Sequence, residues 1–319
     1  MPQFDITIAG ELNLDIIFYG LPEDLPFEQE LLANGLAVTL GSSSAITAHN
    51  LSILGTRVGF ISRVGTDSLG GIALDRLRAA GVDISRVTHS ATSDTGLTVL
   101  LQHDGRRRIL TYPGCMAEMK LEDLDQEYLA SARHFHLSSY FLQRGLMPEV
   151  PNLFRKLKRA GQTISMDTND DPADHWSDGV QDVLGLVDVL MPNEREACKL
   201  AGVSNVEEAM RRLADRVPML VVKQGAKGAI AVVRGKEVSV PAIAVKVVDP
   251  VGAGDTFNAG FLHKYVQGAD LEECLAYGNL AAACSTTRPG GTEAFRDPKC
   301  WKEFFAVNAA RPARLPIRE

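Results

Sequence analysis

Short apolar runs alternate with longer amphipathic segments along most of the chain. Residues 4–10, 163–167 and 219–223 carry few polar side chains, which is typical of strands buried on both faces. Longer segments, such as residues 150–160 and 271–287, repeat apolar residues with a helical period. The alternation predicts an α/β fold, and its regularity favours one large unit over residues 1–319 rather than two domains.

The composition narrows the classes of partner. The 319 residues are 45% hydrophobic and carry a net charge of −7, which argues against nucleic acid or an anionic membrane as the main partner. The five cysteines form no C-x-x-C pair, so we expect reduced thiols. The N-terminus has no basic and apolar leader, and no window is long and apolar enough to cross a membrane. These features predict a cytoplasmic protein.

The most informative stretch is residues 249–257, with the sequence DPVGAGDTF. It follows the apolar run 242–248, a predicted strand, and opens into a predicted helix over residues 258–266. Glycines at 252 and 254 allow successive backbone N–H groups to turn toward one point at the start of that helix. The unpaired N–H groups and the positive end of the helix dipole favour a phosphate there.

Asp255 is unexpected beside a phosphate site because its charge would repel the ligand. One interpretation is that its carboxylate takes a proton from a hydroxyl that attacks the phosphorus. The alternative is that Asp255 simply caps the helix. Other glycine motifs do not fit, since Phe257 stands where a dinucleotide-binding turn needs a third glycine and no Gly-Lys-Ser/Thr occurs.

Residues 249–262, DPVGAGDTFNAGFL, resemble the C-terminal signature of the ribokinase-like (PfkB) carbohydrate kinases. The resemblance implies a three-layer α/β/α fold with a mostly parallel central sheet and a small β-sheet lid. It also implies that the backbone of Gly252, Ala253 and Gly254 forms an anion hole and that Asp255 is the catalytic base. ATP and Mg²⁺ are the implied cofactors.

Candidate acceptor-binding residues follow the first predicted strand. Asn13 and Asp15 lie where the carboxyl end of a strand meets the ligand crevice. Asp15 could merely terminate the strand, but the resemblance includes an Asn-x-Asp at this place, whose Asp binds sugar hydroxyls. Gly41 and Ser42 stand where many members of the family have Gly-Gly, and Ile46 replaces an Asn. The loss of that amide predicts an acceptor other than ribose. The serines that follow Gly41 supply hydroxyls or cap a helix.

The lid implied by the resemblance comprises about residues 14–40 and 93–115. Residues 95–101 and 107–112 read as a hairpin, and a cover of this kind would keep water from the phosphoryl group. Arg106, Arg107 and Arg108 alternate across its second strand, so one or two of them could face a ligand, although most such runs are only solvated. Exposed lid edges could also pair in a homodimer.

Further candidate residues lie in the second half of the chain. Asn193 and Glu196 form either a capping box or the family's Asn-x-x-Glu motif, in which Glu196 would contact Mg²⁺ through water. The acids and amides of residues 168–171 lie at the same predicted sheet edge. The remaining assignments follow from the resemblance: Lys223, Gly225 and Gly228 near the nucleotide, Asn279 near adenine, and Asp249 beside a monovalent cation such as K⁺.

Together these features predict an ATP-dependent kinase that phosphorylates a hydroxyl of a sugar or a sugar-like molecule. A nucleoside kinase of the same fold is the alternative within this class, because Ile46 favours a less polar acceptor. A catalytically silent ligand sensor is the alternative outside it. The sequence does not identify the acceptor, the hydroxyl that is phosphorylated or the oligomeric state.

Overall fold

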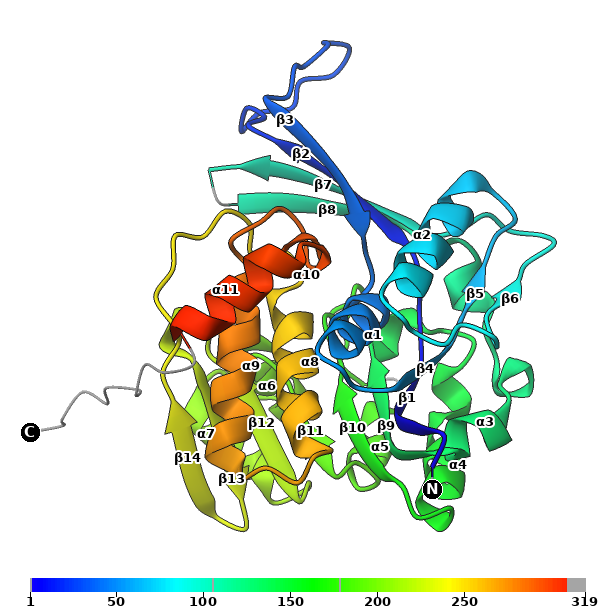
Figure 1. Ribbon diagram of the computed structural model, residues 1–319, viewed down its shortest axis with the longest axis vertical. Coiled ribbons are helices and arrows are strands. Elements are labelled where there is room, and N and C mark those ends of the chain that lie inside the picture. Colours follow the sequence, from blue (N-terminus) through cyan, green and yellow to red (C-terminus); the bar gives the residue numbers. More distant parts are fainter. Residues whose placement is uncertain (1, 105, 178, 309–319) are drawn as a thin grey trace, which may run out of the picture.

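The computed structural model describes residues 2–104, 106–177 and 179–308. Eight strands form a large sheet in the order β14-β13-β12-β11-β10-β9-β1-β4 (Figure 1). From β4 to β12 neighbouring strands are parallel, and β13 and β14 add an antiparallel edge. The strand bounds are β1 Phe4–Ala9, β4 Val58–Ile61, β9 Ala132–Ser138, β10 Thr163–Asp167, β11 Val189–Leu190, β12 Met219–Lys223, β13 Ala229–Val233 and β14 Lys236–Val240.

Helices cover both faces of the large sheet, which explains why its strands are apolar on both sides. One buried cluster joins the sheet to α3–α7, and another joins it to α1, α2, α8 and α9. A third lies where α10 and α11 pack on α9. The bounds are α1 Ser43–Ile53, α2 Ser68–Ala79, α3 Gln126–Ala130, α4 Val150–Arg159, α5 Val180–Leu184, α6 Glu194–Ala201, α7 Val206–Ala214, α8 Ala253–Tyr265, α9 Leu271–Ser285, α10 Glu293–Arg296 and α11 Pro298–Asn308.

A separate four-stranded sheet, here called the small sheet, lies beyond the carboxyl end of β1 (Figure 1). Its strands are ordered β3-β2-β7-β8, with bounds β2 Leu14–Tyr19, β3 Gly35–Leu40, β7 Leu97–His103 and β8 Arg106–Tyr112. The pairings of Asp15 with Thr98 and of Thr98 with Thr111 place these three side chains on one face. We call this the inner face, because Tyr19 and Gln102 on the same face contact Asp249 of the glycine-rich turn. A two-stranded sheet pairs β5 Arg63–Val64 with β6 Thr88–His89.

The predicted fold class is confirmed: helices cover both faces of a mostly parallel sheet, and a small sheet stands apart. The predicted strand over residues 242–248 is wrong. Pro241 has no N–H to donate directly after β14, and the chain then leaves the sheet and bonds the end of α9, where the Val248 N–H donates to the Thr286 carbonyl at 2.8 Å. Gly105 in the predicted hairpin turn, with residues 1, 178 and 309–319, lies outside the described residues.

Candidate active site

The glycine-rich turn delivers backbone N–H groups to the start of α8. Gly252 is the N-cap residue, with a φ of 71° that favours glycine. A Cβ added there would lie only 2.5 Å from the Gly291 Cα, so the close approach of Gly291 also requires glycine. The Ala253 N–H donates to the Pro250 carbonyl at 3.2 Å. In the described part of the chain the N–H groups of Gly254 and Asp255 have no acceptor. These two groups, at the positive end of the helix, suit an anion.

Asp255 is the third residue of α8 and makes no capping bond, so the alternative that it caps the helix is excluded. Its side chain is buried, with 9% of its surface exposed. The Asn169 amide lies 3.5 Å from its Oδ1, and the Ser43 hydroxyl also bonds it. Burial and the charge of Asp167 raise the pKa of Asp255, and the Lys223 cation opposes them. A poorly coordinated carboxylate with a raised pKa is suited to accept a proton.

The neighbours of Asp255 hold a buried ion pair that sequence reasoning missed. Asp167, at the carboxyl end of β10, accepts from Lys223 Nζ and, at 2.6 Å, from the Asn258 amide. A Cβ added at Gly254 would lie 3.5 Å from Lys223 Nζ, which places this cation beside the free N–H groups. Burial disfavours the Lys223 cation, but the charges of Asp167 and Glu196 outweigh that effect and raise its pKa. The only hint in the sequence was an acid ending an otherwise apolar strand.

Asn193 and Glu196 form a complete capping box at the start of α6. The Asn193 N–H donates to Glu196 Oε2 at 2.8 Å, and the Glu196 N–H donates to Asn193 Oδ1 at 2.9 Å. Burial and the negative charge of Asp167 raise the pKa of Glu196 to about 7, whereas the Lys223 cation lowers it. The capping interpretation is therefore correct, and the same side chain also belongs to the charge cluster around Lys223.

Asp249 is fully buried and its oxygens accept four hydrogen bonds. The Tyr19 hydroxyl and the Gly290 N–H donate to Oδ2 at 2.7 and 2.9 Å. The Gln102 amide and the Val251 N–H donate to Oδ1 at 3.1 and 3.0 Å. Tyr19 and Gln102 lie on the small sheet, so Asp249 ties that sheet to the glycine-rich turn. This contact was not predicted, and nothing local in the sequence marks it.

Asn13, Asp15 and Gly41 come together at the base of the small sheet. A Cβ added at Gly41 would lie 2.1 Å from Asp15 Oδ1 and 2.9 Å from Asn13 Oδ1, so glycine lets both side chains approach. The Asn13 amide donates to Thr98, whereas its buried Oδ1 has no donor. Burial, with the negative charges of Asp255 and Asp249, raises the pKa of Asp15 to about 7. A free acceptor beside a carboxyl group suits a ligand rich in hydroxyls.

The Ser42 hydroxyl is used within the protein. It donates to the Glu11 carbonyl at 2.8 Å and caps α1, accepting from the Ala45 N–H at 3.4 Å. Its φ of 60° explains why a second glycine would suit this position. Ile46 is buried, and its Cδ1 would lie 3.2 Å from a Cβ added at Gly252. It therefore packs behind the glycine-rich turn.

A cavity of about 480 Å³ extends from Gly254 to α9. Its walls are mostly apolar and include the segment 242–247 that was predicted as a strand. Gly225 and Gly228 line it, and a Cβ at Gly228 would lie 2.1 Å from the Val240 carbonyl oxygen. Asn279 also lines it and donates its amide to the Val240 carbonyl at 2.9 Å. An apolar slot that ends at an anion site matches a flat base followed by phosphates.

Comparison with known proteins agrees with this geometry. The family model described as pfkB family carbohydrate kinase matches residues 4–298. This chain belongs to the pfkB family of carbohydrate kinases. The family resemblance and the enzyme class predicted from residues 249–262 are therefore confirmed.

Individual members of the pfkB family show how widely the match extends. An ATP-dependent ribose-1-phosphate kinase of Halopiger xanaduensis is 31% identical, over 91% of this chain and 94% of its own. A cytidine kinase of Thermococcus kodakarensis is 28% identical, over 86% and 94%. The crystal structure of a candidate ribokinase II from E. coli with ATP and Mg²⁺ superimposes with a TM-score of 0.83 at 26% identity, covering 95% of this chain and 99% of that one.

The predicted residues of this pfkB chain lie at three places: the start of α8, the base of the small sheet and the cavity beside α9. Gly252, Gly254 and Asp255 start α8, and Lys223 lies beside them. Asn13, Asp15 and Gly41 lie at the base of the small sheet, and Gly225, Gly228 and Asn279 line the cavity. The structure differs in that the hydroxyl of Ser42, the N–H of Ala253 and the oxygens of Asp249 already have partners. Their proposed ligand contacts stay predictions.

Proposed function

We propose that this kinase transfers the γ-phosphoryl group of ATP to a hydroxyl of a sugar-like molecule, with Asp255 as the general base. The observation that carries the proposal is a buried, poorly coordinated carboxylate next to two free N–H groups and a lysine cation. Proton acceptor and anion site stand side by side, as a phosphoryl transfer to an alcohol needs.

The acceptor oxygen forms a bond to the γ-phosphorus while the bond from that phosphorus to the bridging oxygen breaks, and ADP leaves with the electron pair. The hydroxyl proton passes to an Asp255 oxygen. Asn169 and Ser43 keep that carboxylate in place. The N–H groups of Gly254 and Asp255, with Lys223, stabilise the charge that develops on the phosphoryl oxygens.

The cavity of about 480 Å³ is the proposed nucleotide site. Gly225 and Gly228 let backbone approach the nucleotide, and α9 with segment 242–247 encloses the base. The E. coli structure with ATP and Mg²⁺ supports these two cofactors. Mg²⁺, when bound, would neutralise phosphate charge. Both Glu196 oxygens already accept from Asn193, so Glu196 fits contact with the ion through water and not direct ligation.

The small sheet is the proposed lid of a single domain. Asp15 and the free Asn13 Oδ1 would orient the acceptor beneath it. The sheet follows directly on β1 and is held to the glycine-rich turn through Asp249, so it can cover the crevice and exclude water. Relatives named for cytidine and for ribose 1-phosphate show that the acceptor must be sought in more than one class.

Three further predictions accompany the kinase proposal. A monovalent cation at Asp249 would have to displace donors that occupy both oxygens, so activity in K⁺ compared with tetramethylammonium tests that role. Homodimerisation would cover the outer face of the small sheet, which light scattering tests; the exposed large apolar residues of that face are Leu36, Val38, Leu110 and Tyr112. A cytoplasmic location suits an ATP-dependent enzyme whose five cysteines are all free. No helix in the described residues has the length and apolar character to span a bilayer.

The test is ADP release by the full chain with ATP, Mg²⁺ and a panel of sugars, sugar acids, sugar phosphates and nucleosides. We expect turnover with at least one acceptor and its loss in Asp255→Asn. A chain that binds an acceptor and ATP but never releases ADP would instead support a silent ligand sensor.

A further inference from the structure

The inner face of the small sheet carries an arginine that makes no hydrogen bond or ion pair within the described residues. In the strand register Arg107 on β8 lies opposite Gln102 on β7. Side chains directly opposite in an antiparallel pair share a face, and the Gln102 amide reaches down to Asp249. Arg107 therefore projects from the same face as Gln102 and Asp15, toward the crevice.

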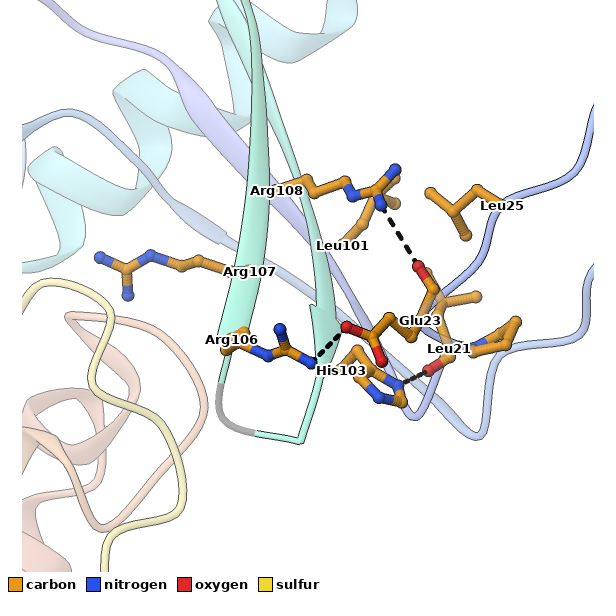
Figure 2. Close-up of a pocket in the computed structure, with 9 residues that line it drawn as sticks. Leu21, Glu23, Leu25, Leu101, His103, Arg106, Arg107 and Arg108 are labelled. Atoms are coloured by element: carbon orange, nitrogen blue, oxygen red, sulfur yellow. Dashed lines mark hydrogen bonds and ion pairs between the residues drawn. The ribbon is translucent and has the colours of Figure 1, made fainter.

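The two neighbouring arginines behave differently. Arg106 donates to Glu23 Oε1 at 2.5 Å and Arg108 donates to the Glu23 carbonyl at 3.3 Å. Both thus anchor the loop after β2 on the outer face. Figure 2 shows these side chains turned toward Glu23 and that of Arg107 turned to the opposite side of the hairpin. The alternation of the three arginines therefore separates two structural side chains from one that faces the crevice.

Arg107 is exposed on the inner face, so its guanidinium group is accessible to a ligand. On the inner face of the described small sheet it is the one basic side chain; the other inner residues of the strands are Asp15, Ile17, Tyr19, Ala37, Thr39, Thr98, Leu100, Gln102, Ile109 and Thr111. Asp15 on β2 and Arg107 on β8 lie on the same face of the sheet. Asp15 forms no ion pair with it in the described structure.

The nucleotide cavity does not account for this arginine. Every residue that lines that cavity comes from positions 223–286, and none comes from the small sheet. A ligand that bound Arg107 would instead lie against the inner face of the small sheet, which carries Asp15. A guanidinium group recognises planar carboxylates and phosphates through paired N–H donors.

We propose that the acceptor carries an anionic group, a carboxylate or a phosphate ester, and that Arg107 binds it while the reacting hydroxyl lies at Asp255. This proposal rests on the proposed kinase function and narrows its substrate class. Arg107 would raise affinity and selectivity without taking part in the proton transfer.

The experiment compares matched acceptors. The full chain is assayed with D-ribose and D-ribose 1-phosphate, and with D-glucose and D-gluconate, so that the phosphate and carboxylate arms are separate. Binding of the same four compounds is measured by calorimetry without ATP. The variants are Arg107→Gln, Arg107→Lys and, as a control with the next side chain on the other face, Arg108→Gln.

We expect the wild type to favour one anionic acceptor over its neutral partner by tenfold or more. Arg107→Gln should raise KM for that acceptor by about 10- to 100-fold, with KM for ATP and kcat little changed. Arg107→Lys should recover part of the loss, and Arg108→Gln should behave as wild type.

Two outcomes would overturn the proposal: no anionic compound of the panel bound better than its neutral partner, or Arg107→Gln raising KM for ATP instead. Failure of the kinase proposal looks different. If calorimetry shows Arg107-dependent binding of an anion but no acceptor yields ADP, the binding role of Arg107 is supported and the proposed kinase activity is contradicted.

Discussion

Asp249 and Asp255 are six residues apart in one motif, both are buried, and they have opposite environments. Asp249 accepts four hydrogen bonds at 2.7 to 3.1 Å, two of them from the small sheet. Asp255 has the Asn169 amide at 3.5 Å and the Ser43 hydroxyl, and it faces the charge of Asp167. Four hydrogen-bond donors thus surround the Asp249 carboxylate. The charge of the Asp255 carboxylate is destabilised, because this group is buried with few donors.

The difference shows how a structural acid can be told from a reactive one. Both oxygens of Asp249 are occupied by donors from the small sheet and from the glycine-rich turn and its surroundings, so Asp249 is suited to hold two parts of the protein together. A carboxylate that lacks such bonds keeps its capacity to accept a proton. Substitutions of the two acids and of their charged neighbours test this comparison.

Asp255→Asn should lower kcat by about 10²- to 10⁴-fold, because the amide cannot take the hydroxyl proton. KM for ATP should change little. At pH 8 the variant should unfold at the same temperature as the wild type or a higher one, because a buried charge with a raised pKa has been removed. Steady-state kinetics and thermal unfolding check both parts, and near-normal turnover would remove Asp255 from the role of base.

Lys223→Met should lower kcat by about 10- to 100-fold, since it removes the cation beside Gly254. It should also lower the free energy of unfolding by about 3 kcal/mol, because Asp167 is left buried and unpaired. Adding Asp167→Asn should restore much of the stability but not the turnover. The control is Lys227→Met, at an exposed lysine of the same loop, and an equal loss of turnover there would argue against a specific role for Lys223.

Asp249→Asn should lower the free energy of unfolding by about 2 kcal/mol, because its new NH₂ group faces donors that lose their acceptor. Tyr19→Phe removes one of the four bonds and should cost about 1 kcal/mol. Chemical denaturation measures both. A loss of kcat in Asp249→Asn as deep as that in Asp255→Asn, with unchanged stability, would reverse the roles given to the two acids.

Lowering the pH through about 7 should reduce kcat/KM for the acceptor, because Asp15 titrates near that pH and its protonated form is a weaker acceptor for hydroxyl groups. Because burial raises the pKa of Asp15 to about 7, its contribution to the free energy of unfolding falls as the pH rises from its ordinary pKa to about 7, and it stays constant above that. Asp15→Asn should therefore raise the unfolding temperature more at pH 8 than at pH 5. An equal gain at both values would show that Asp15 titrates in its ordinary range.

The sequence predicted what depends on local pattern. Apolar runs indicated the buried parallel strands, and the spacing of Gly252 and Gly254 indicated a turn that opens a helix with free N–H groups. The segment 242–248 was mistaken for a strand because apolar residues that wall a cavity look like residues that enter a sheet.

Long-range contacts could not be predicted in this way. The bonds from Tyr19 and Gln102 to Asp249 join residues 230 and 147 positions apart. The partnership of Asp167 with Lys223 depends on which strands lie side by side, and the orientation of Arg107 depends on the strand register. These features follow from the tertiary arrangement and become visible only once the sheets are assembled.

The most direct test of the central claim compares Asp255→Asn and Asp249→Asn in parallel, measuring kcat and the free energy of unfolding for each at pH 8. We predict that the two variants lose different properties. Asp255→Asn loses at least 99% of its turnover and keeps its stability. Asp249→Asn loses stability and retains turnover within about tenfold of wild type. An Asp255→Asn variant that kept its turnover but lost stability would contradict the assignment of Asp255 as the base.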